Sequence, residues 1–145
     1  MFTRTVAVII LLLIGTIAYV RLAPSPAERW HVSPTPAGPG DYPEAGGFRA
    51  VRRITAPRDE VMAAVEQIAK ATPRTHLLAG RAAAGMMTFL TRSRIMGFPD
   101  YTTIAIVDDT LIIYGRLRFG WSDVGVNRAR VESWLDALGP LTEPL

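Results

Sequence analysis

Two kinds of side chain in this sequence could do chemistry: arginines on neighbouring predicted strands, and aspartates beside glycine corners. Guanidinium groups gathered near a helix N-terminus form strong hydrogen bonds to carboxylates, phosphates or sulfates. Together with two tyrosines on the same face, the arginines predict a site for an anionic ligand. The candidate ligand-binding residues are Arg92, Arg94, Tyr101, Tyr114, Arg116 and Arg118.

The same arginines could instead lock the fold by pairing with acidic side chains at the glycine corners. The predicted structural polar cluster consists of Asp100, Ser122, Asp123, Asn127 and Arg128. Asn127 lies on the apolar stripe of a predicted helix, so it should be buried and hydrogen-bonded, with backbone groups of residues 97–101 or 119–122 as partners. Arg128 and Glu132 are spaced as an exposed helical pair, which adds little stability. The sequence leaves the binding site and the structural lock open.

A catalytic role is a third alternative, and it rests on Asp100 and Asp123. Two carboxylates can serve a hydrolase as acid and base when their pKa values are pushed apart. Arginines flank both here, which should lower the carboxyl pKa values and weaken a general acid. Ser93 and Ser122 have no histidine nearby in the sequence to activate them. We therefore expect a non-catalytic protein and assign no catalytic residue.

Composition excludes several classes of protein. The chain has 145 residues, no cysteine and a net charge of +3, so disulfides, thiol catalysis and thiolate metal sites are absent. His31 and His76 are not part of a metal-ligand pattern, so no metal or cofactor is expected. Basic residues are spread along the chain without interleaved aromatics, which argues against nucleic acid as a partner. The mild positive charge favours an anionic surface or ligand.

The N-terminal segment, residues 1–23, is long and apolar enough to span a membrane. Residues 5–20 carry no charge, and Arg21 can extend to the interface, which brings the segment close to the ~20 residues that cross a bilayer. We predict an uncleaved anchor that contacts the membrane through residues 5–23, with a cleaved signal peptide as the alternative. The very short tail before the span favours a domain on the periplasmic or extracytoplasmic side.

Behind the anchor, the sequence divides into a tether, one folded domain and a short tail. Residues 24–47 hold six prolines and four glycines, a composition typical of an extended tether. Within it, Trp30-His31-Val32 would either dock on the domain or rest at the membrane interface. Residues 48–139 form the predicted domain, and residues 140–145 the tail.

Alternation of apolar and polar residues predicts an α+β domain of about five strands and two helices. The predicted strands are residues 48–55, 75–79, 86–94, 101–107 and 110–118, and the helices run from Pro57 to Thr72 and from Ser122 or Asp123 to Gly139. A two-residue turn at Asp108-Asp109 sets Tyr101 opposite Arg116. The order β-α-β-β-β-β-α predicts an antiparallel sheet with both helices on one face and the first strand at an edge. Its open face would present the arginines and tyrosines.

Several short pieces of the domain resemble the bacterial domain-of-unknown-function 1499 family. They are Pro73-Arg74-Thr75, Arg92-Ser93, Gly97-Phe98-Pro99-Asp100-Tyr101, Arg116, Arg118, Gly120, residues 122–128 and Arg130-Val131. The resemblance covers roughly residues 48–138. It implies a small domain, often exported or membrane-tethered in bacteria, and it implies no activity, because none is established for that family.

These observations predict a membrane-tethered, non-catalytic binding module. Its partner would be an anionic small molecule, a lipid headgroup or a protein of the cell envelope. The first alternative is a structural or envelope-assembly protein in which the same residues only lock the fold, and the second is a hydrolase that uses Asp100 and Asp123. Arg116→Ala separates the first two readings, because it would abolish binding in one and lower the melting temperature in the other.

Overall fold

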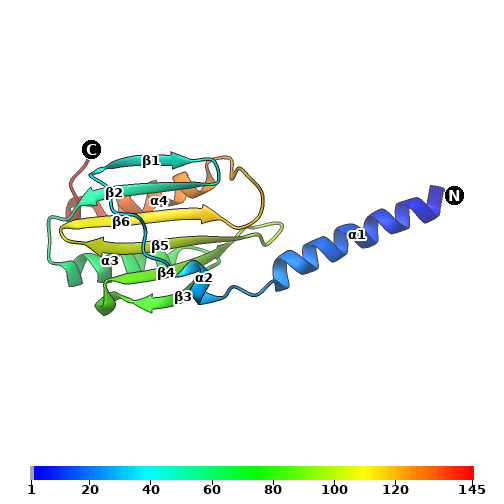
Figure 1. The fold of residues 1–145 in the computed structure, drawn as a ribbon, viewed down its shortest axis with the longest axis horizontal. Coiled ribbons are helices and arrows are strands. Elements are labelled where there is room, and N and C mark those ends of the chain that lie inside the picture. Colours follow the sequence, from blue (N-terminus) through cyan, green and yellow to red (C-terminus); the bar gives the residue numbers. More distant parts are fainter. Residues whose placement is uncertain (1) are drawn as a thin grey trace.

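The computed structural model describes residues 2–145, an N-terminal helix followed by a domain of helices on a sheet (Figure 1). The elements in chain order are α1 (Phe2–Leu22), α2 (Ala27–Trp30), β1 (Gly40–Glu44), β2 (Gly47–Arg53), α3 (Arg58–Ala71), β3 (Thr75–Arg81), the 3-10 turn η1 (Ala82–Ala84), β4 (Met86–Arg92), β5 (Pro99–Val107), β6 (Thr110–Leu117), α4 (Val126–Leu138) and the 3-10 turn η2 (Gly139–Leu141). Six strands form one antiparallel sheet in the order β1-β2-β6-β5-β4-β3. The predicted α+β class is confirmed, with one strand more than expected.

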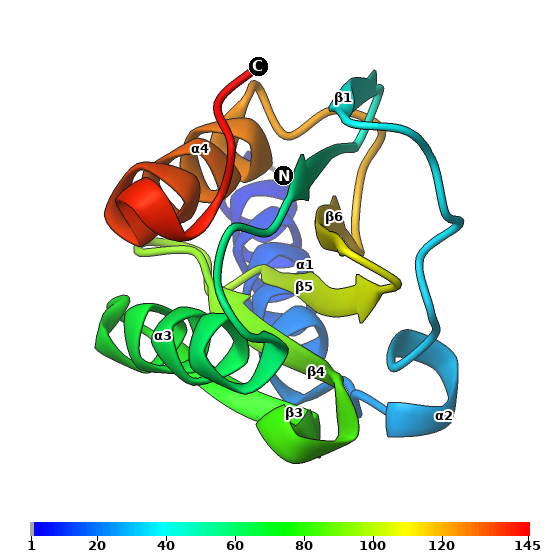
Figure 2. The same ribbon diagram turned by 90° about the vertical axis from the view of Figure 1, so that its left-hand side faces the viewer.

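Helices α3 and α4 lie on the same face of the sheet, and the main hydrophobic core lies between them and the strands (Figure 2). Alternate strand residues supply this core, among them Met87 and Phe89 of β4 and Ile104 of β5. Trp134 of α4 meets Phe89 edge to face, with ring centroids 6.2 Å apart. Its indole N–H donates to the Thr72 hydroxyl at 2.9 Å, so the one polar atom of this buried ring is satisfied.

The hairpin of β5 and β6 has the register that the turn at Asp108-Asp109 predicts. Asp108 adopts a positive φ of 52°, and Val107 then pairs with Thr110. Counting back along both strands sets Tyr101 opposite Arg116. Because side chains alternate between faces, Tyr101 and Arg116 lie on the face opposite the core, as expected.

The predicted tether holds an additional strand. Residues Gly40–Glu44 pair with β2 as the edge strand β1, and Arg52 bonds Asp41 across the pair at 2.8 Å. Pro43 is tolerated because one side of an edge strand makes no ladder hydrogen bonds. The prediction that the first domain strand, now β2, forms a sheet edge is wrong, because β1 and β6 flank it. The prolines and glycines of this segment give no strand pattern in the sequence, and the strand is stabilised by its pairing with β2.

The last helix begins later than predicted, at Val126 rather than at Ser122 or Asp123. Gly125 precedes it with a φ of 81°, a left-handed conformation that favours glycine. The Asp123 carboxylate still serves the helix start, because it accepts the backbone N–H groups of Gly125 at 3.1 Å and Asn127 at 2.7 Å. Val124 therefore lies outside the helix and is exposed. The prediction that it belongs to the apolar stripe of this helix is wrong.

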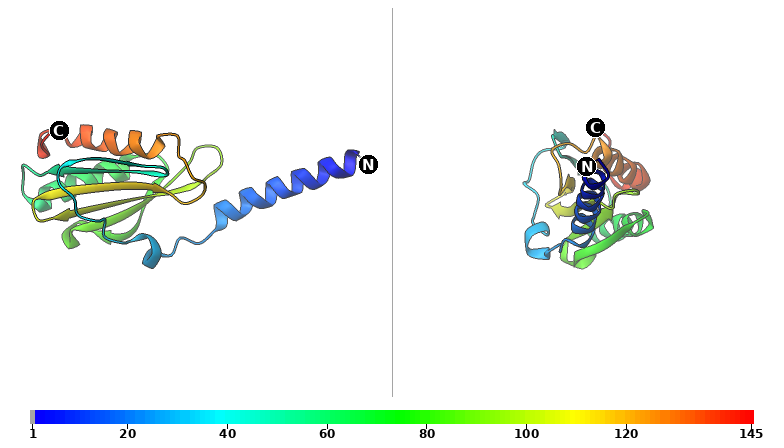
Figure 3. Two further views of the ribbon diagram at one scale, coloured as in Figure 1. Left: turned by 45° about the horizontal axis from the view of Figure 1, so that its top comes forward. Right: turned by 90° about the vertical axis from the view of Figure 1, so that its right-hand side faces the viewer.

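Helix α1 projects away from the domain as a separate rod (Figures 1 and 3). Its 21 residues have a mean hydropathy of 2.3 over the most apolar window, and at ~1.5 Å per residue the helix matches the thickness of a bilayer core. Only Val20 of this helix is buried. Its length and composition fit a membrane span, and they fit a signal sequence equally well.

Candidate functional site

One face of the sheet is covered by the chain's own residues 23–36, which we call the strap. Its Trp30 stacks on Tyr101 of β5 with ring centroids 3.8 Å apart and planes 11° from parallel. Tyr101 is fully buried by this contact, and its hydroxyl is 2.7 Å from that of Ser25. The strap runs over the face opposite α3 and α4 (Figure 2). Of the two places predicted for Trp30-His31-Val32, docking on the domain is the one observed.

The strap occupies two of the arginines expected to bind a ligand. Arg116 donates hydrogen bonds to the carbonyl of Trp30 and, at 3.0 Å, to the Thr103 hydroxyl. Arg118 donates to the carbonyl of Pro24 at 2.6 Å and to the Tyr101 hydroxyl at 3.2 Å. Backbone carbonyls of the strap thus accept hydrogen bonds from the guanidinium groups that were expected to bind an anion.

Burial under the strap changes the acid–base properties of this face. Desolvation lowers the pKa of Arg116, because its charged form has lost water, although an arginine remains a cation at neutral pH. Burial also raises the pKa of Tyr114, helped by the hydrogen bond of its hydroxyl to Glu44 at 2.7 Å. Arg116 also lies over the Tyr114 ring, 4.9 Å from its centroid. Both residues therefore have partners within the chain.

Arg92 and Arg94 lie apart from Arg116 and Arg118, in a pocket at the end of the sheet. The pocket has a volume of about 450 Å³ and is lined by Arg21, Arg74, Thr75, His76, Arg92, Ser93, Arg94 and Gly97. Four of these eight residues are arginines, and none is an aspartate or glutamate. We call this the basic pocket. The basic pocket lies between the end of α1, the start of β3 and the start of the β4–β5 loop.

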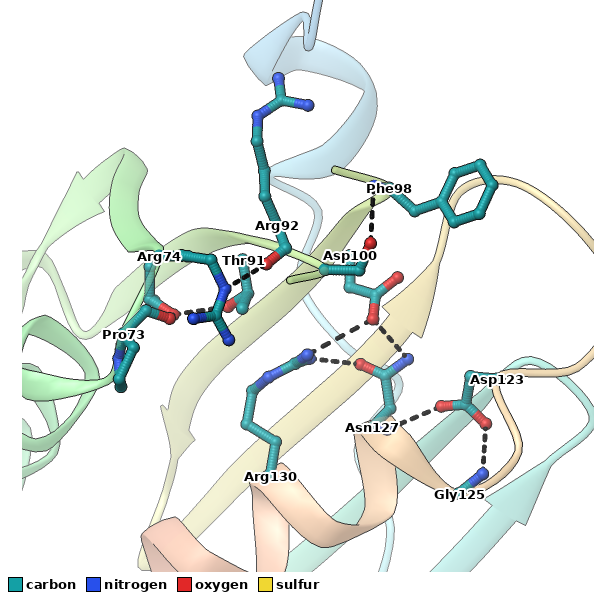
Figure 4. Close-up of polar contacts among 12 residues, drawn as sticks. Pro73, Arg74, Thr91, Arg92, Phe98, Asp100, Asp123, Gly125, Asn127 and Arg130 are labelled. Atoms are coloured by element: carbon teal, nitrogen blue, oxygen red, sulfur yellow. Dashed lines mark hydrogen bonds and ion pairs between the residues drawn. The ribbon is translucent and has the colours of Figure 1, made fainter. Parts of the chain in front are cut away.

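The basic pocket is built by arginines that bond the main chain and keep other nitrogens free. Arg21 donates to the carbonyls of Ile95 at 2.9 Å and Met96 at 3.3 Å. Arg74 donates through Nε to the carbonyl of Arg92 at 3.1 Å (Figure 4). Arg92 donates through Nη1 to the carbonyl of Gly97 at 3.0 Å. Each of these three guanidinium groups retains a terminal nitrogen without a partner among residues 2–145.

Two further observations single out Arg74 and Arg94. Arg74 has a φ of 58°, a left-handed conformation that side chains rarely adopt and that is enriched at functional sites. Its carbonyl accepts the Arg92 N–H at 3.0 Å, so backbone and side chain fasten the two arginines together. Arg94 is exposed and makes no hydrogen bond or ion pair with any described residue. Three of the pieces that carry the family resemblance, residues 73–75, 92–93 and 97–101, meet at this pocket.

Of the residues predicted to form a structural polar cluster, Asp100 and Asn127 contact each other and Arg130, while Arg128 is not part of this network (Figure 4). Asn127 is fully buried, as predicted, and its side-chain oxygen accepts from Arg130 at 2.6 Å. Its side-chain nitrogen lies 3.5 Å from the Asp100 carboxylate, and Arg130 contacts the same carboxylate oxygen at 3.4 Å. The expected backbone partners of the Asn127 side chain were wrong, because side chains fill these places.

The pKa of Asp100 is raised, which contradicts the expected lowering by arginines. Burial is the largest cause, and Asp123 adds to it, while Arg130 and the Asn127 amide act in the opposite direction. None of the four arginines proposed to pair with Asp100 or Asp123 does so within residues 2–145. Asp100 thus faces donors from α4 and belongs to a packed network that ties β5 to that helix.

The other members of the predicted cluster have local roles. Arg128 is exposed and bonds Glu132 at 2.8 Å, the helical pair expected from the spacing. The Ser122 hydroxyl accepts the Val124 N–H at 3.3 Å and so shapes the loop before α4. His31 bonds the Thr88 hydroxyl at 2.9 Å, and His76 lines the basic pocket. No group of three or more potential metal ligands occurs in the described part of the chain.

Sequence reasoning missed Arg21, Arg74 and Arg130 as site residues. Arg74 and Arg130 were visible in the pieces that resemble the family, but only the fold shows what they contact. Arg21 was assigned to the end of the apolar segment, and its contact with Ile95 joins residues 74 positions apart. Nothing in the local sequence pattern signals a contact of that range.

Comparison with known proteins identifies the family of this chain. The family model described as "Protein of unknown function (DUF1499)" matches residues 22–138, and the chain therefore belongs to that family. The match begins at the strap, so it includes the segment that covers the sheet. Searches of curated proteins and of solved structures found no match.

Proposed function

We propose that this member of the DUF1499 family is a membrane-anchored binding module whose basic pocket holds an anionic phosphate-bearing group. The observation that carries the proposal is the lining of the pocket, which contains four arginines and no carboxylate. Structural arginines in proteins are normally paired with acidic side chains or fully bonded to carbonyls. An uncompensated cluster with free guanidinium nitrogens is suited to an anion supplied from outside the chain.

The chemistry of the pocket favours phosphate over a single carboxylate. Guanidinium forks bind phosphate oxygens in pairs, and Arg74, Arg92 and Arg94 approach the pocket from one strand and two loops. The Ser93 hydroxyl adds an uncharged donor at the same place, because it accepts the Phe98 N–H and keeps its own proton. A volume of about 450 Å³ has room for a headgroup rather than only an ion.

The position of the pocket favours a phospholipid headgroup as the source of the phosphate. Arg21 ends α1 and lines the pocket, and an arginine at the end of an apolar helix extends toward the headgroup layer. With α1 as a membrane anchor, the pocket opens at the level of the lipid phosphates. A soluble phosphate compound offers the same chemistry, so the test must separate these two sources.

We place the domain on the extracytoplasmic side of the membrane, as the short N-terminal tail favours. The absence of cysteine makes this simple to test, because a single introduced cysteine is the only thiol in the chain. Leu145→Cys should react with a membrane-impermeant maleimide in bacterial spheroplasts. Labelling only after lysis would contradict the proposed orientation.

The binding proposal is tested on the full chain in phosphatidylcholine nanodiscs with and without phosphatidylglycerol. Wild type should melt several degrees higher when the anionic lipid is present, because ligand binding stabilises the folded state. Arg94→Ala should lose most of this shift, because it removes one of the guanidinium groups that line the pocket. The variant should still fold, since Arg94 makes no hydrogen bond or ion pair with any described residue. A parallel series with inorganic phosphate in neutral nanodiscs tests the soluble source.

Arg81→Ala is the matched control, because it removes the same charge from the opposite end of β3. It should retain the full shift, which separates pocket binding from a general loss of positive charge. Equal shifts for Arg94→Ala and Arg81→Ala would contradict the pocket. A shift with inorganic phosphate alone would assign the ligand to solution instead of the bilayer.

The alternative of a structural role is favoured for Arg116 and Arg118. Both donate to carbonyls of the strap, so their hydrogen bonds are used within the chain. In this reading, the arginines of the sheet face fasten the segment that follows α1. The two proposals are compatible, because the basic pocket and the strap-covered face involve different arginines.

A further inference from the structure

Two loops at one end of the domain expose large apolar side chains. They are residues 93–98, between β4 and β5, and residues 118–125, between β6 and α4; together we call them the tip loops. Ile95 is 80% exposed, Trp121 87% and Val124 92%. Apolar side chains gathered at one end of a domain usually mark a contact surface, because exposing them to water is unfavourable.

The tip loops adjoin the end of α1. Arg21 bonds the carbonyl of Ile95 at 2.9 Å, so the helix and the first loop are in direct contact. The Phe119 ring lies 6.1 Å from that of Tyr19 and 6.5 Å from that of Phe98, which links both loops to the helix. Figures 1 and 3 show both loops at the end of the domain from which α1 projects.

We infer that the tip loops insert Ile95, Trp121 and Val124 into the interface of the lipid bilayer beside α1. The inference rests on the anchoring of α1 in the proposed function, and not on anion binding by the basic pocket. Because Arg21 stands at the interface end of the helix and touches Ile95, the first loop reaches the headgroup layer without any movement of the domain. Tryptophan is enriched at this depth because its ring is apolar and its N–H is polar.

Insertion fixes how the domain sits on the membrane. The loops and α1 make separate contacts with the bilayer, so the domain cannot swing freely on its anchor. Arg94 precedes Ile95 directly and lies in the first loop. Docking therefore brings Arg94 of the basic pocket close to the lipid phosphates.

The test uses fluorescence quenching of the full chain in vesicles of brominated phosphatidylcholine. Trp30 and Trp134 are buried in the domain, so Trp121 is the exposed indole that bromine atoms can reach. Emission should fall clearly relative to vesicles without bromine, and most of this loss should vanish in Trp121→Phe. Ile95→Ser with Val124→Ser, two exposed positions, should reduce quenching of Trp121 severalfold.

A control places a tryptophan at the far end of the domain, as Leu145→Trp in the Trp121→Phe chain. Residue 145 is exposed and lies away from α1, so its emission should be unaffected by bromine (Figure 1). Flotation of the chain with the vesicles reports anchoring separately. A chain that floats while Trp121 is not quenched would overturn the inference and leave the anchor intact. A blue-shifted Trp121 emission that depends on protein concentration and ignores bromine would overturn it in favour of a second copy.

Discussion

Arg116 of β6 bonds the main-chain carbonyl of Trp30, 86 residues earlier, and its guanidinium lies 5.6 Å from the centroid of the Trp30 ring. This pair fastens the segment after α1 to the middle of the sheet. The strap is thereby part of the domain, and the distance between the membrane-spanning candidate helix and the sheet is fixed.

Arg116→Ala should lower the free energy of unfolding by about 2 to 3 kcal/mol, because it leaves the Trp30 carbonyl and the Thr103 hydroxyl short of a charged donor. Thermal unfolding of the full chain in detergent micelles measures the change. Arg81→Ala, an exposed arginine of β3, should melt like wild type. An Arg116→Ala chain with an unchanged melting temperature would return this residue to the list of ligand-binding candidates.

Trp30→Ala should release the strap from the sheet, because the stacking contact with Tyr101 is its largest apolar attachment. Trypsin cleavage after the exposed Arg29 should then become severalfold faster at a temperature where the domain stays folded. Val32→Ala removes an exposed neighbour and should leave the rate unchanged. Equal rates in all three chains would mean that Trp30 does not hold the strap.

Asn127→Ala should destabilise the chain by about 2 kcal/mol, because it removes the buried acceptor of an Arg130 hydrogen bond. The neighbouring Arg128→Ala is the control, since Arg128 is exposed, bonds Glu132 of the same helix and lies over the Phe48 ring, contacts whose loss should cost little stability. Chemical unfolding of both variants measures the difference. A similar loss in the free energy of unfolding for the two variants would show that the buried network around Asn127 contributes no more stability than an exposed ion pair.

Asp100 should make stability depend on pH in a defined direction. Its pKa in the folded state is raised by burial, so the folded chain binds more protons than the unfolded chain above about pH 4. The contribution of this group is therefore fully present below about pH 4 and is lost as the pH rises through the folded-state pKa. Asp100→Asn lacks this loss, and its stability relative to wild type should rise over the same range.

The measurement is a series of melting temperatures between pH 4 and pH 7 for wild type and Asp100→Asn. Other titrating groups are common to both chains, so the difference isolates Asp100. If the melting temperature of Asp100→Asn relative to wild type fell with rising pH, the effect of Arg130 on the pKa of Asp100 would outweigh that of desolvation.

Val124→Gly should stabilise the chain and at the same time weaken docking of the tip loops. Val124 has a φ of 52°, and this left-handed conformation is strained for a β-branched residue. After the greater chain entropy of glycine is subtracted, the expected gain is about 0.5 to 1 kcal/mol. Thermal unfolding measures the gain, and quenching of Trp121 by brominated lipid should decrease. A loss of stability would contradict the strain.

Local pattern sufficed for elements whose contacts are close in sequence. The turn at Asp108-Asp109 set the β5–β6 register, and alternation assigned the core face correctly. The strand Gly40–Glu44 escaped prediction because prolines and glycines carry no periodic signal, and for Trp30-His31-Val32 of the strap the sequence left docking on the domain as one of two alternatives. Their stability comes from partners far along the chain, such as Tyr101 for Trp30.

The four arginines that the sequence grouped together lie at two separate places in the fold. Arg92 and Arg94 were placed with Arg116 and Arg118 because all four lie near the ends of paired strands. The strap separates them, since it uses Arg116 and Arg118 and leaves the other two to the pocket. The direction of the pKa shift of Asp100 could not be predicted from the sequence either. The sequence shows arginines nearby, but only the fold shows that burial removes water from the carboxyl group.

Native mass spectrometry tests the central claim, binding of an anionic headgroup in the basic pocket, most directly. The full chain is extracted from bilayers of equal phosphatidylcholine and phosphatidylglycerol, and the lipids that remain bound are counted. Wild type and Arg81→Ala should retain phosphatidylglycerol selectively, whereas Arg94→Ala should retain severalfold less. Equal retention of both lipids by wild type, or undiminished retention by Arg94→Ala, would contradict this claim.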